Sequence, residues 1–313
     1  MIIFVTGATG VLGRPVVQRL IQNGHQVRAL SRSETNRTLL QIAGAVPLDA
    51  DLFDPVSLAS AVEGCDAILH LATRIPTVAD LKDPTLWSEN DRIRRDGIRN
   101  LIEAARGTSG VKTIVYPSIT FFYGDGGPDW ISADMAEIAP CDVLKSSLDA
   151  EAEVAAFAGS SADRRGITLR FGYFYGPSSP DSVQAIEMAR KGLAMTAAAR
   201  PSYKSMIWID DAAAAVVEAV ENAPSGVYDV VEDDPSTQQE ALDALATAVG
   251  RKRLMRLPRF LLRFAVPSDL RGILARSQRI SNARFRDMTG WRPEVPSQRE
   301  GWRRMGIKAE AAE

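Results

Sequence analysis

The stretch TGATGVLG, residues 6–13, decides the fold of this chain. It follows a short apolar run, residues 2–5, which has the length and branched side chains of a buried strand. After it, residues 14–23 carry apolar side chains at helical spacing, among them Val16, Leu20 and Ile21. A strand, a glycine turn and a helix in this order predict the first unit of a parallel α/β sheet.

The glycine spacing within this stretch is that of a dinucleotide-binding turn. Gly7 permits the tight turn, Gly10 lets the backbone approach a pyrophosphate, and Gly13 lets the helix pack against the strand. The free N–H groups at the start of the helix would then face the phosphates. The sequence therefore predicts a dinucleotide cofactor, although glycine turns also occur for purely structural reasons.

Composition limits the remaining choices. The chain has 313 residues, of which 45% are hydrophobic, enough for one large domain or two unequal ones. Two cysteines and two histidines make neither a disulfide framework nor a metal centre, so we expect no metal. The first residues read as a strand rather than a signal peptide, and no apolar stretch is long enough to span a bilayer. We therefore expect a cytoplasmic protein.

The net charge of −2 conceals an uneven distribution. Residues 251–304 contain fifteen Lys/Arg and four Asp/Glu. A solvated face is the simple interpretation, and a phosphate-bearing substrate is the sharper one. No nucleic-acid-binding module is recognisable. The run of arginines after residue 250 could suggest membrane contact, but Pro258 and Pro267 interrupt it, so we expect a folded lobe and no membrane.

The second strand, residues 26–30, ends without an acidic residue. In NAD-binding folds an acid at this point binds the ribose hydroxyls. Here Arg32 and Arg14, with Arg37 in reserve, could instead hold a 2′-phosphate. The sequence thus favours NADP over NAD, unless these arginines are only solvated surface charges.

Strands and helices alternate six times up to residue 177, which predicts a Rossmann-type doubly wound parallel sheet. The expected later strands cover residues 45–48, 67–71, 113–116 and 167–171, and the helices between them include residues 55–63, 86–106 and 142–158. Beyond residue 177 we expect a helix over 182–193 and mostly a smaller C-terminal substrate lobe. Residues 205–231 are expected to return in part to the core. His70, inside an apolar run, is expected to be a packed residue.

In order along the chain, these pieces resemble the extended short-chain dehydrogenases/reductases, the NAD(P)-dependent epimerase/dehydratase family, and in particular their atypical members. The resemblance covers nearly the whole chain. The pieces that carry it are the glycine stretch, Asp51-Leu52, His70-Leu71-Ala72, Gly97 with Asn100, Tyr123-Gly124, Lys145, Leu169-Arg170, Tyr175-Gly176-Pro177, Trp208-Ile209-Asp210-Asp211, Ser281-Asn282 and Gly290-Trp291-Arg292-Pro293.

The resemblance implies which residues hold the cofactor. Its pyrophosphate would contact Gly7, Thr9, Gly10, Val11, Leu12 and Gly13. Asp51 and Leu52 would border the adenine, and Leu71, Ala72 and Thr73 would line the cofactor path. Tyr173 and Phe174 would approach the nicotinamide.

The resemblance also implies a Tyr four residues before a Lys, with a Ser or Thr nearby. The Lys ammonium would hold the nicotinamide ribose and lower the phenol pKa, and the phenol would move a proton while hydride moves at carbon. Lys145 is present, but Cys141 takes the position of the Tyr. The hydroxyl position falls on Ile119, with Ser118 and Thr120 on either side.

A thiol is a weak hydrogen-bond donor, so this replacement leaves the proton donor open. Cys141 could be that donor, a nucleophile, or a small buried residue. A substitute acid could come from Tyr123, Tyr173, Tyr203 or Asp142. We place Tyr123 and Tyr203 on the substrate side.

Two functions remain open. The first is an NADP-dependent oxidoreductase acting on a small carbonyl or alcohol substrate, either a secondary metabolite or a nucleotide-sugar. The second is a non-redox protein on the same fold: a cofactor-sensing regulator, or an isomerase, cyclase or lyase. A homodimer is common in the family that the chain resembles.

Overall fold

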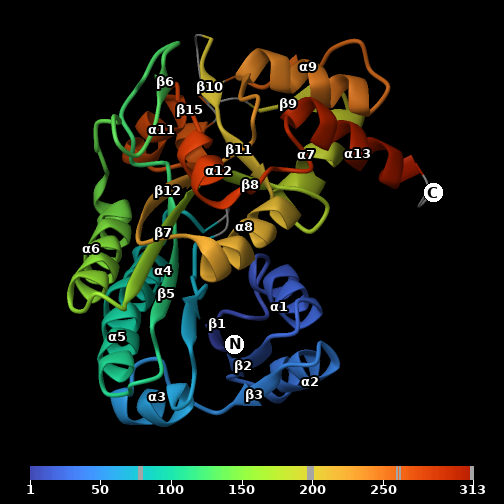
Figure 1. Ribbon diagram of the computed structural model, residues 1–313. Helices are drawn as coiled ribbons and strands as arrows, with labels where there is room; N and C mark the ends of the chain where they lie inside the picture. Colours follow the sequence, from blue (N-terminus) through green and yellow to red (C-terminus); the bar gives the residue numbers. More distant parts are fainter. Residues whose placement is uncertain (77–79, 196–200, 259, 261, 311–313) are drawn as a thin grey trace.

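The computed structural model describes residues 1–310 except 77–79, 196–200, 259 and 261 (Figure 1). Its centre is a seven-stranded, wholly parallel sheet with the strand order β12-β7-β5-β4-β1-β2-β3. The strands are β1 (Ile2–Thr6), β2 (Gln26–Leu30), β3 (Val46–Leu48), β4 (Ala67–His70), β5 (Thr113–Ile119), β7 (Arg165–Phe171) and β12 (Gly226–Val230). This sheet confirms the predicted doubly wound α/β fold.

Helices cover both faces of the sheet, as Figure 1 shows. One face packs against α1 (Gly13–Gln22), α2 (Glu34–Ile42) and α8 (Ile209–Asn222). The other face packs against α3 (Pro55–Val62), α5 (Ile98–Arg106) and α6 (Lys145–Gly159). Each core is made of side chains from alternate positions of the strands, because successive residues of a strand point to opposite faces.

A smaller lobe lies beyond the carboxyl ends of the strands (Figure 1). Its helices are α7 (Pro180–Arg190), α9 (Gln238–Ala248), α10 (Leu262–Ala265), α11 (Ser268–Ala275), α12 (Ala283–Thr289) and α13 (Gln298–Glu310). Its short strand pairs are β6 (Trp130–Ile131) with β15 (Arg279–Ile280), β8 (Tyr173–Tyr175) with β11 (Met206–Trp208), β9 (Leu193–Ala194) with β14 (Met255–Arg256), and β10 (Tyr203–Lys204) with β13 (Ser236–Thr237).

Two predicted helices differ from the structure. The helix expected over 86–106 is α4 (Pro84–Arg92), a π-helical segment (Ile93–Gly97) and α5. At the start of the π segment, the Ile93 carbonyl oxygen lies 3.2 Å from the His70 ring nitrogen Nε2. The helix expected over 182–193 runs from Pro180 to Arg190, because Gly192 takes a left-handed backbone with a φ of 81° and β9 begins directly after it at Leu193.

The helix starts follow from local capping. The Asp54 carboxylate accepts a hydrogen bond from the Val56 N–H at 3.1 Å, so Asp54 is the N-cap of α3. Before α9, Thr237 and Glu240 form a reciprocal capping box. No helix in the described part of the chain combines the length and the apolar character needed to cross a bilayer.

Candidate functional site

The glycine loop between β1 and α1 has no room for side chains. A Cβ on Gly7, whose φ is 69°, would lie 2.5 Å from the Ala72 N, and a Cβ on Gly13 would lie 2.1 Å from the Gly7 carbonyl oxygen. A Cβ on Gly10 would lie 3.2 Å from the same oxygen. Gly7 therefore makes the tight turn, as predicted, and Gly13 lets the start of α1 lie close against the loop. The approach of Gly10 to a pyrophosphate stays a prediction.

The start of α1 has few free backbone donors. No side chain caps this helix, and its first turn has no acidic residue. The Arg14 N–H donates to the Gly10 carbonyl at 3.1 Å and Pro15 has no N–H, so within the first turn the Gly13 N–H and the positive end of the helix dipole remain to face an anion. Thr9 and Val11 lie in the loop that precedes them, and the side chain of Leu12 is buried beneath it. These residues fit a dinucleotide pyrophosphate.

The other predicted cofactor residues lie around this loop. Leu71 continues the pairing of β4 with β1, its N–H donating to the Thr6 carbonyl at 3.1 Å, and the Thr6 hydroxyl lies 3.4 Å from the Ala72 N. Gly7 is in direct contact with the backbone of both Leu71 and Ala72. Thr73 follows and is exposed. The structure thus brings the 71–73 segment against the glycine loop.

Asp51 and Leu52, which are predicted to border the adenine, follow β3. The Asp51 carboxylate is exposed and accepts the Phe53 N–H at 2.9 Å. Leu52 is buried, and its carbonyl accepts a hydrogen bond from the Asn100 amide at 3.0 Å. This bond from α5 fixes the turn in which the two predicted residues lie.

The three arginines considered for a 2′-phosphate differ in their contacts. The Arg14 Nε donates to the Thr9 carbonyl at 2.8 Å, which ties it to the glycine loop. Arg37 forms ion pairs with Asp49 and Glu34. Arg32 is exposed and forms no side-chain hydrogen bond or ion pair with any described residue. Arg32 is therefore the most available cation at the end of β2.

His70 is a buried structural residue, as expected. Its Nδ1 lies 2.8 Å from the Thr6 hydroxyl, and its Nε2 meets the Ile93 carbonyl. Burial lowers the pKa of His70 to about 4, so the ring is neutral at pH 7. It joins β1, β4 and the π segment behind the cofactor cleft.

Cys141 lies at the start of a short 3-10 turn (Asp142–Leu144) that leads into α6. It is half-buried and packs in an apolar cluster with Ile119 and Phe121. Burial raises the pKa of the Cys141 thiol, with a smaller contribution from the charge of Asp269, so the thiol is protonated near neutral pH. Cys141 is therefore a neutral thiol, and its place at the position of a catalytic Tyr stays a prediction.

Lys145 is exposed at the first position of α6. Its ammonium pairs with the Asp142 carboxylate at 2.6 Å. That contact raises the pKa of Lys145 and lowers the pKa of Asp142. An exposed pair of this kind contributes little to stability and can open when another partner arrives.

The hydroxyls on either side of Ile119 point into the protein. The Ser118 hydroxyl donates to the Glu151 carboxylate at 2.5 Å, and Glu151 also accepts two hydrogen bonds from Arg170. The Thr120 hydroxyl donates to the Phe171 carbonyl at 3.2 Å. All these side chains are buried, so in this structure both hydroxyls serve the framework.

Tyr123, placed on the substrate side by the sequence, is part of the same buried network. Its hydroxyl donates to the Asp229 carboxylate at 2.6 Å and accepts from the Arg170 guanidinium at 3.0 Å. Asp229 also accepts the Ala133 N–H at 2.6 Å, which anchors the loop after β5. Burial raises the pKa of Asp229 to about 7 and raises the pKa of Tyr123. Tyr123 has no exposed surface with which to meet a substrate here.

Tyr173 differs from Tyr123 because its hydroxyl is not engaged in the buried network. Its ring stacks on Phe121 with centroids 3.9 Å apart, and the Lys204 ammonium lies 5.5 Å from the centroid of the Tyr173 ring. The Tyr173 hydroxyl is buried and has no hydrogen-bond partner among the described residues. Burial raises its pKa, so the phenol keeps its proton. Phe174, next on β8, is 36% exposed.

Lys204 and Tyr203 form strand β10, which pairs with β13. The Lys204 ammonium donates to the Arg276 carbonyl at 3.0 Å, and burial lowers its pKa to about 8. Tyr203 is half-buried and lies under the Arg279 guanidinium, 4.8 Å from its ring centroid. The sequence reasoning missed Lys204; its position just before a short strand, in Tyr203-Lys204-Ser205, was the only available signal.

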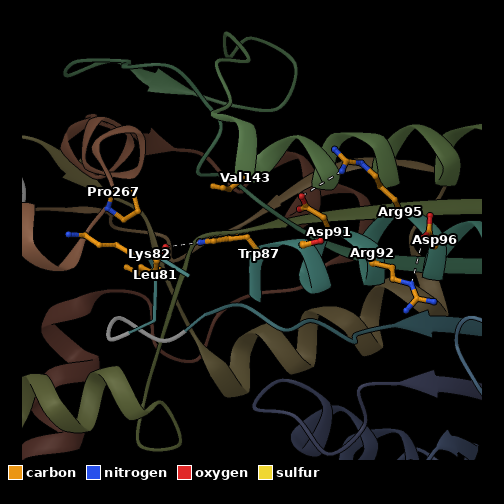
Figure 2. Close-up of a pocket in the computed structure, with 10 residues that line it drawn as sticks. Leu81, Lys82, Trp87, Asp91, Arg92, Arg95, Asp96, Val143 and Pro267 are labelled. Carbon is orange, nitrogen blue, oxygen red and sulfur yellow. Dashed lines mark hydrogen bonds and ion pairs between the residues drawn. The ribbon is translucent and has the colours of Figure 1, made fainter. Parts of the chain in front are cut away.

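A surface hollow of about 550 Å³ lies elsewhere, on the outer side of α4 (Figure 2). It is lined by residues that include Lys82, Trp87, Arg95, Val143 and Pro267. None of them belongs to the glycine loop or to the predicted catalytic set. No group of three or more His, Cys, Asp and Glu side chains in the described ranges could hold a metal ion.

Known proteins resemble this chain over most of its length. The model of the NAD dependent epimerase/dehydratase family matches residues 3–231 of this chain. A 3-diazoavenalumate denitrifying reductase from a Streptomyces species is 30% identical over 313 residues, covering 96% of this chain and 99% of that protein. A 2-alkyl-3-oxoalkanoate reductase from Stenotrophomonas maltophilia is 29% identical, covering 81% of this chain and 77% of the other.

Solved structures agree on the architecture. A human epimerase family protein, crystallised with NADPH, superposes with a TM-score of 0.80 at 20% identity, covering 98% of this chain and 99% of the other. At that identity the likeness establishes the fold.

Proposed function

Because the chain belongs to the NAD dependent epimerase/dehydratase family, we propose that it is an NADP-dependent oxidoreductase of a small organic substrate. The observation that carries the NADP preference is the pair of cations beside the glycine loop, the exposed Arg32 and the loop-bound Arg14. No carboxylate follows β2 directly to bind a ribose hydroxyl, since residues 31–33 are Ser-Arg-Ser.

Each part of the cleft has a defined task in this proposal. The first turn of α1 binds the pyrophosphate, and Arg32 takes the 2′-phosphate through charge-assisted hydrogen bonds. Lys145 leaves Asp142 and holds the nicotinamide ribose. When bound, the cofactor supplies or accepts a hydride at the substrate carbon.

For a carbonyl substrate, such as a secondary metabolite or the sugar of a nucleotide-sugar, the oxygen must also receive a proton. Tyr123 is occupied by Asp229 and Arg170, and Ser118 by Glu151. Among the other candidate donors, the Tyr173 hydroxyl has no partner among the described residues and the Cys141 thiol is neutral. The Tyr173 hydroxyl is buried, so its ring has to move before it can meet a substrate. We assign the proton to Tyr173 on that condition, because a phenol is a stronger hydrogen-bond donor than a thiol.

A second substrate class follows from the missing tyrosine. The relative that matches along nearly its whole length is named for reducing a diazo compound with loss of nitrogen. Hydride added to an arenediazonium cation gives a neutral arene and N₂, and no oxygen has to be protonated. This reaction needs no phenol as a proton donor, so a site with Cys141 at that position could support it. We therefore propose an aryl diazo acid as the alternative acceptor.

The first experiment is a fluorescence titration with NADPH and with NADH. We expect tighter NADPH binding, and we expect Arg32→Gln to weaken it by roughly ten-fold while leaving NADH unchanged. Arg37→Gln is the matched control, since Arg37 is already paired with Asp49. Equal binding of the two cofactors would refute the NADP preference, and binding of neither would favour a non-redox role.

Turnover measurements then distinguish the two proposed substrate classes. Oxidation of NADPH is measured with ketones and with arenediazonium salts, and N₂ release is measured in parallel. With a ketone, Tyr173→Phe should reduce the rate; with a diazonium it should not. Ketone reduction that survives Tyr173→Phe unchanged would exclude the assigned proton donor.

A further inference from the structure

One part of the lobe surface combines apolar and basic side chains. Residues 251–268, called here the basic segment, contain six Lys/Arg and no Asp or Glu. Arg251, Lys252, Arg253, Arg256 and Arg263 are all exposed. The sequence alone argued against membrane contact because prolines interrupt the segment, but it could not show which apolar side chains the fold leaves uncovered.

The uncovered apolar side chains are large. Met255 is 65% exposed, Phe260 58% and Phe264 63%. Single exposed apolar residues occur on every protein surface, whereas several within ten positions mark a contact surface. Met195 adds to this set: it is 48% exposed and follows β9, the strand that pairs with β14 of the basic segment.

The aromatic and basic groups lie together. The Arg263 guanidinium is 4.7 Å from the Phe264 ring centroid and 5.8 Å from the Phe260 ring centroid. A guanidinium beside two exposed rings suits an interface between water and lipid, where rings enter the apolar side and the cation stays with the headgroups.

Backbone contacts hold the basic segment to the lobe. The Leu257 N–H donates to the Ala194 carbonyl at 2.8 Å, next to the β9–β14 pair. The Lys82 ammonium donates to the Arg263 carbonyl at 3.0 Å. Figure 2 shows Lys82 beside Pro267, where the basic segment reaches the hollow over α4. These contacts hold the backbone on either side of Phe260, and next to Phe264, against the rest of the lobe.

The charge decides between possible occupants. A second copy of the chain, meeting this surface with the same surface, would bring two sets of cations together without counter-charges. An anionic lipid surface supplies those counter-charges and also takes up apolar side chains. We propose that the basic segment docks the protein on a membrane surface that carries anionic lipids, with Met255, Phe260 and Phe264 entering the headgroup layer.

The test is co-sedimentation of the full-length protein with lipid vesicles. Vesicles of phosphatidylcholine alone are compared with vesicles that also contain phosphatidylglycerol. Binding is expected only to the second kind, and it should weaken as salt is added. Equal binding to both kinds, or to neither, would overturn the proposal.

Two variants separate the apolar and charged contributions. The double variant Phe260→Ser/Phe264→Ser should weaken binding by at least ten-fold, from the apolar transfer energy of the rings. Arg263→Gln should weaken it by about five-fold. The matched control is Ile42→Ser/Val56→Ser, since these side chains are 79% and 77% exposed on the cofactor-binding side of the molecule. The control should bind as the wild type does.

The replaced side chains are exposed, so the variants should unfold at the wild-type temperature. If the phenylalanine variant instead turned a dimer into a monomer, measured by light scattering, the surface would be a subunit contact and the membrane proposal would be wrong. Binding to heparin with no binding to vesicles would also overturn it. This proposal needs no cofactor and no substrate, so it stands or falls apart from the proposed function.

Discussion

Glu232 offers a direct test of how the lobe is held to the sheet. It follows β12 and is 1% exposed. Its carboxylate oxygens lie 3.4 Å from the Met206 N, the Gln298 amide and the Tyr175 hydroxyl. The Tyr175 hydroxyl has a single hydrogen and lies closer to the Ser297 carbonyl, at 3.1 Å. A protonated Glu232 can therefore donate to the Tyr175 oxygen, which a carboxylate cannot do.

Burial raises the pKa of Glu232 from 4.5 to about 8. The folded state then holds a proton that the unfolded chain releases. The stability that this proton contributes is fully present below pH 4.5. It falls progressively as the pH rises from 4.5 to 8 and is lost above 8. A difference of about 3.5 pKa units corresponds to roughly 5 kcal/mol as an upper bound, which is a large part of the total stability of an ordinary protein.

The perturbation is Glu232→Gln, which mimics the protonated acid at every pH. Its amide can donate to the Tyr175 oxygen while its carbonyl accepts from the Met206 N. The free energy of unfolding is measured with urea from pH 5 to 9. As the pH rises from 5 to 8, the free energy of unfolding of the variant should exceed that of the wild type by a growing amount, which reaches several kcal/mol near pH 8.

The comparison isolates Glu232 from other groups. Asp229, whose pKa is raised to about 7, also loses stabilisation as the pH rises, but it does so equally in both proteins. Glu187→Gln, on the exposed side of α7, is the control and should follow the wild type. Parallel curves for Glu232→Gln and the wild type across this range would refute a protonated buried acid.

Three further changes test the cofactor cleft. Gly13→Ala should abolish NADPH binding and lower the unfolding temperature, because its Cβ would lie 2.1 Å from the Gly7 oxygen; calorimetry and fluorescence check both. Lys145→Ala should weaken NADPH binding or turnover strongly with little change in stability, since its Asp142 partner is exposed; unchanged turnover would exclude the ribose role. If Cys141 supplies a proton, Cys141→Ser should shift the pH–rate profile, whereas an unaltered profile would exclude that role.

Much of the fold could be predicted because its signals are local. The glycine stretch, the apolar strands and the Asp54 cap each depend on a few neighbouring residues. The π segment could not be predicted, because it is stabilised by His70, which is more than twenty positions away and on another element. Similarly, the end of α7 depended on the left-handed backbone of Gly192, and a glycine near a helix end does not always stop the helix.

The candidate site was predictable only in its backbone. The glycine loop and the 71–73 segment are adjacent in the structure, as the resemblance implies. The partners of the side chains were not predictable, because they are distant in sequence. Tyr123 reads as a substrate-side phenol, yet Asp229, 106 positions later, takes its hydroxyl. Nothing near Tyr123 in the sequence indicates this pairing.

The buried network around Arg170 explains why Ser118 and Tyr123 are poor replacements for the proton-donating tyrosine that the resemblance implies. Arg170 is held by Glu151 on one side and Tyr123 on the other. Burial alone would lower the pKa of Arg170, but the hydrogen bonds and the charge of Glu151 outweigh it and raise that pKa. Freeing Ser118 or Tyr123 for catalysis would remove a hydrogen bond from a buried carboxylate, Glu151 or Asp229, which costs about 1.5–3 kcal/mol. A proton donor from outside this network avoids that cost. Tyr173, whose hydroxyl is unpartnered among the described residues, has no such hydrogen bond to lose.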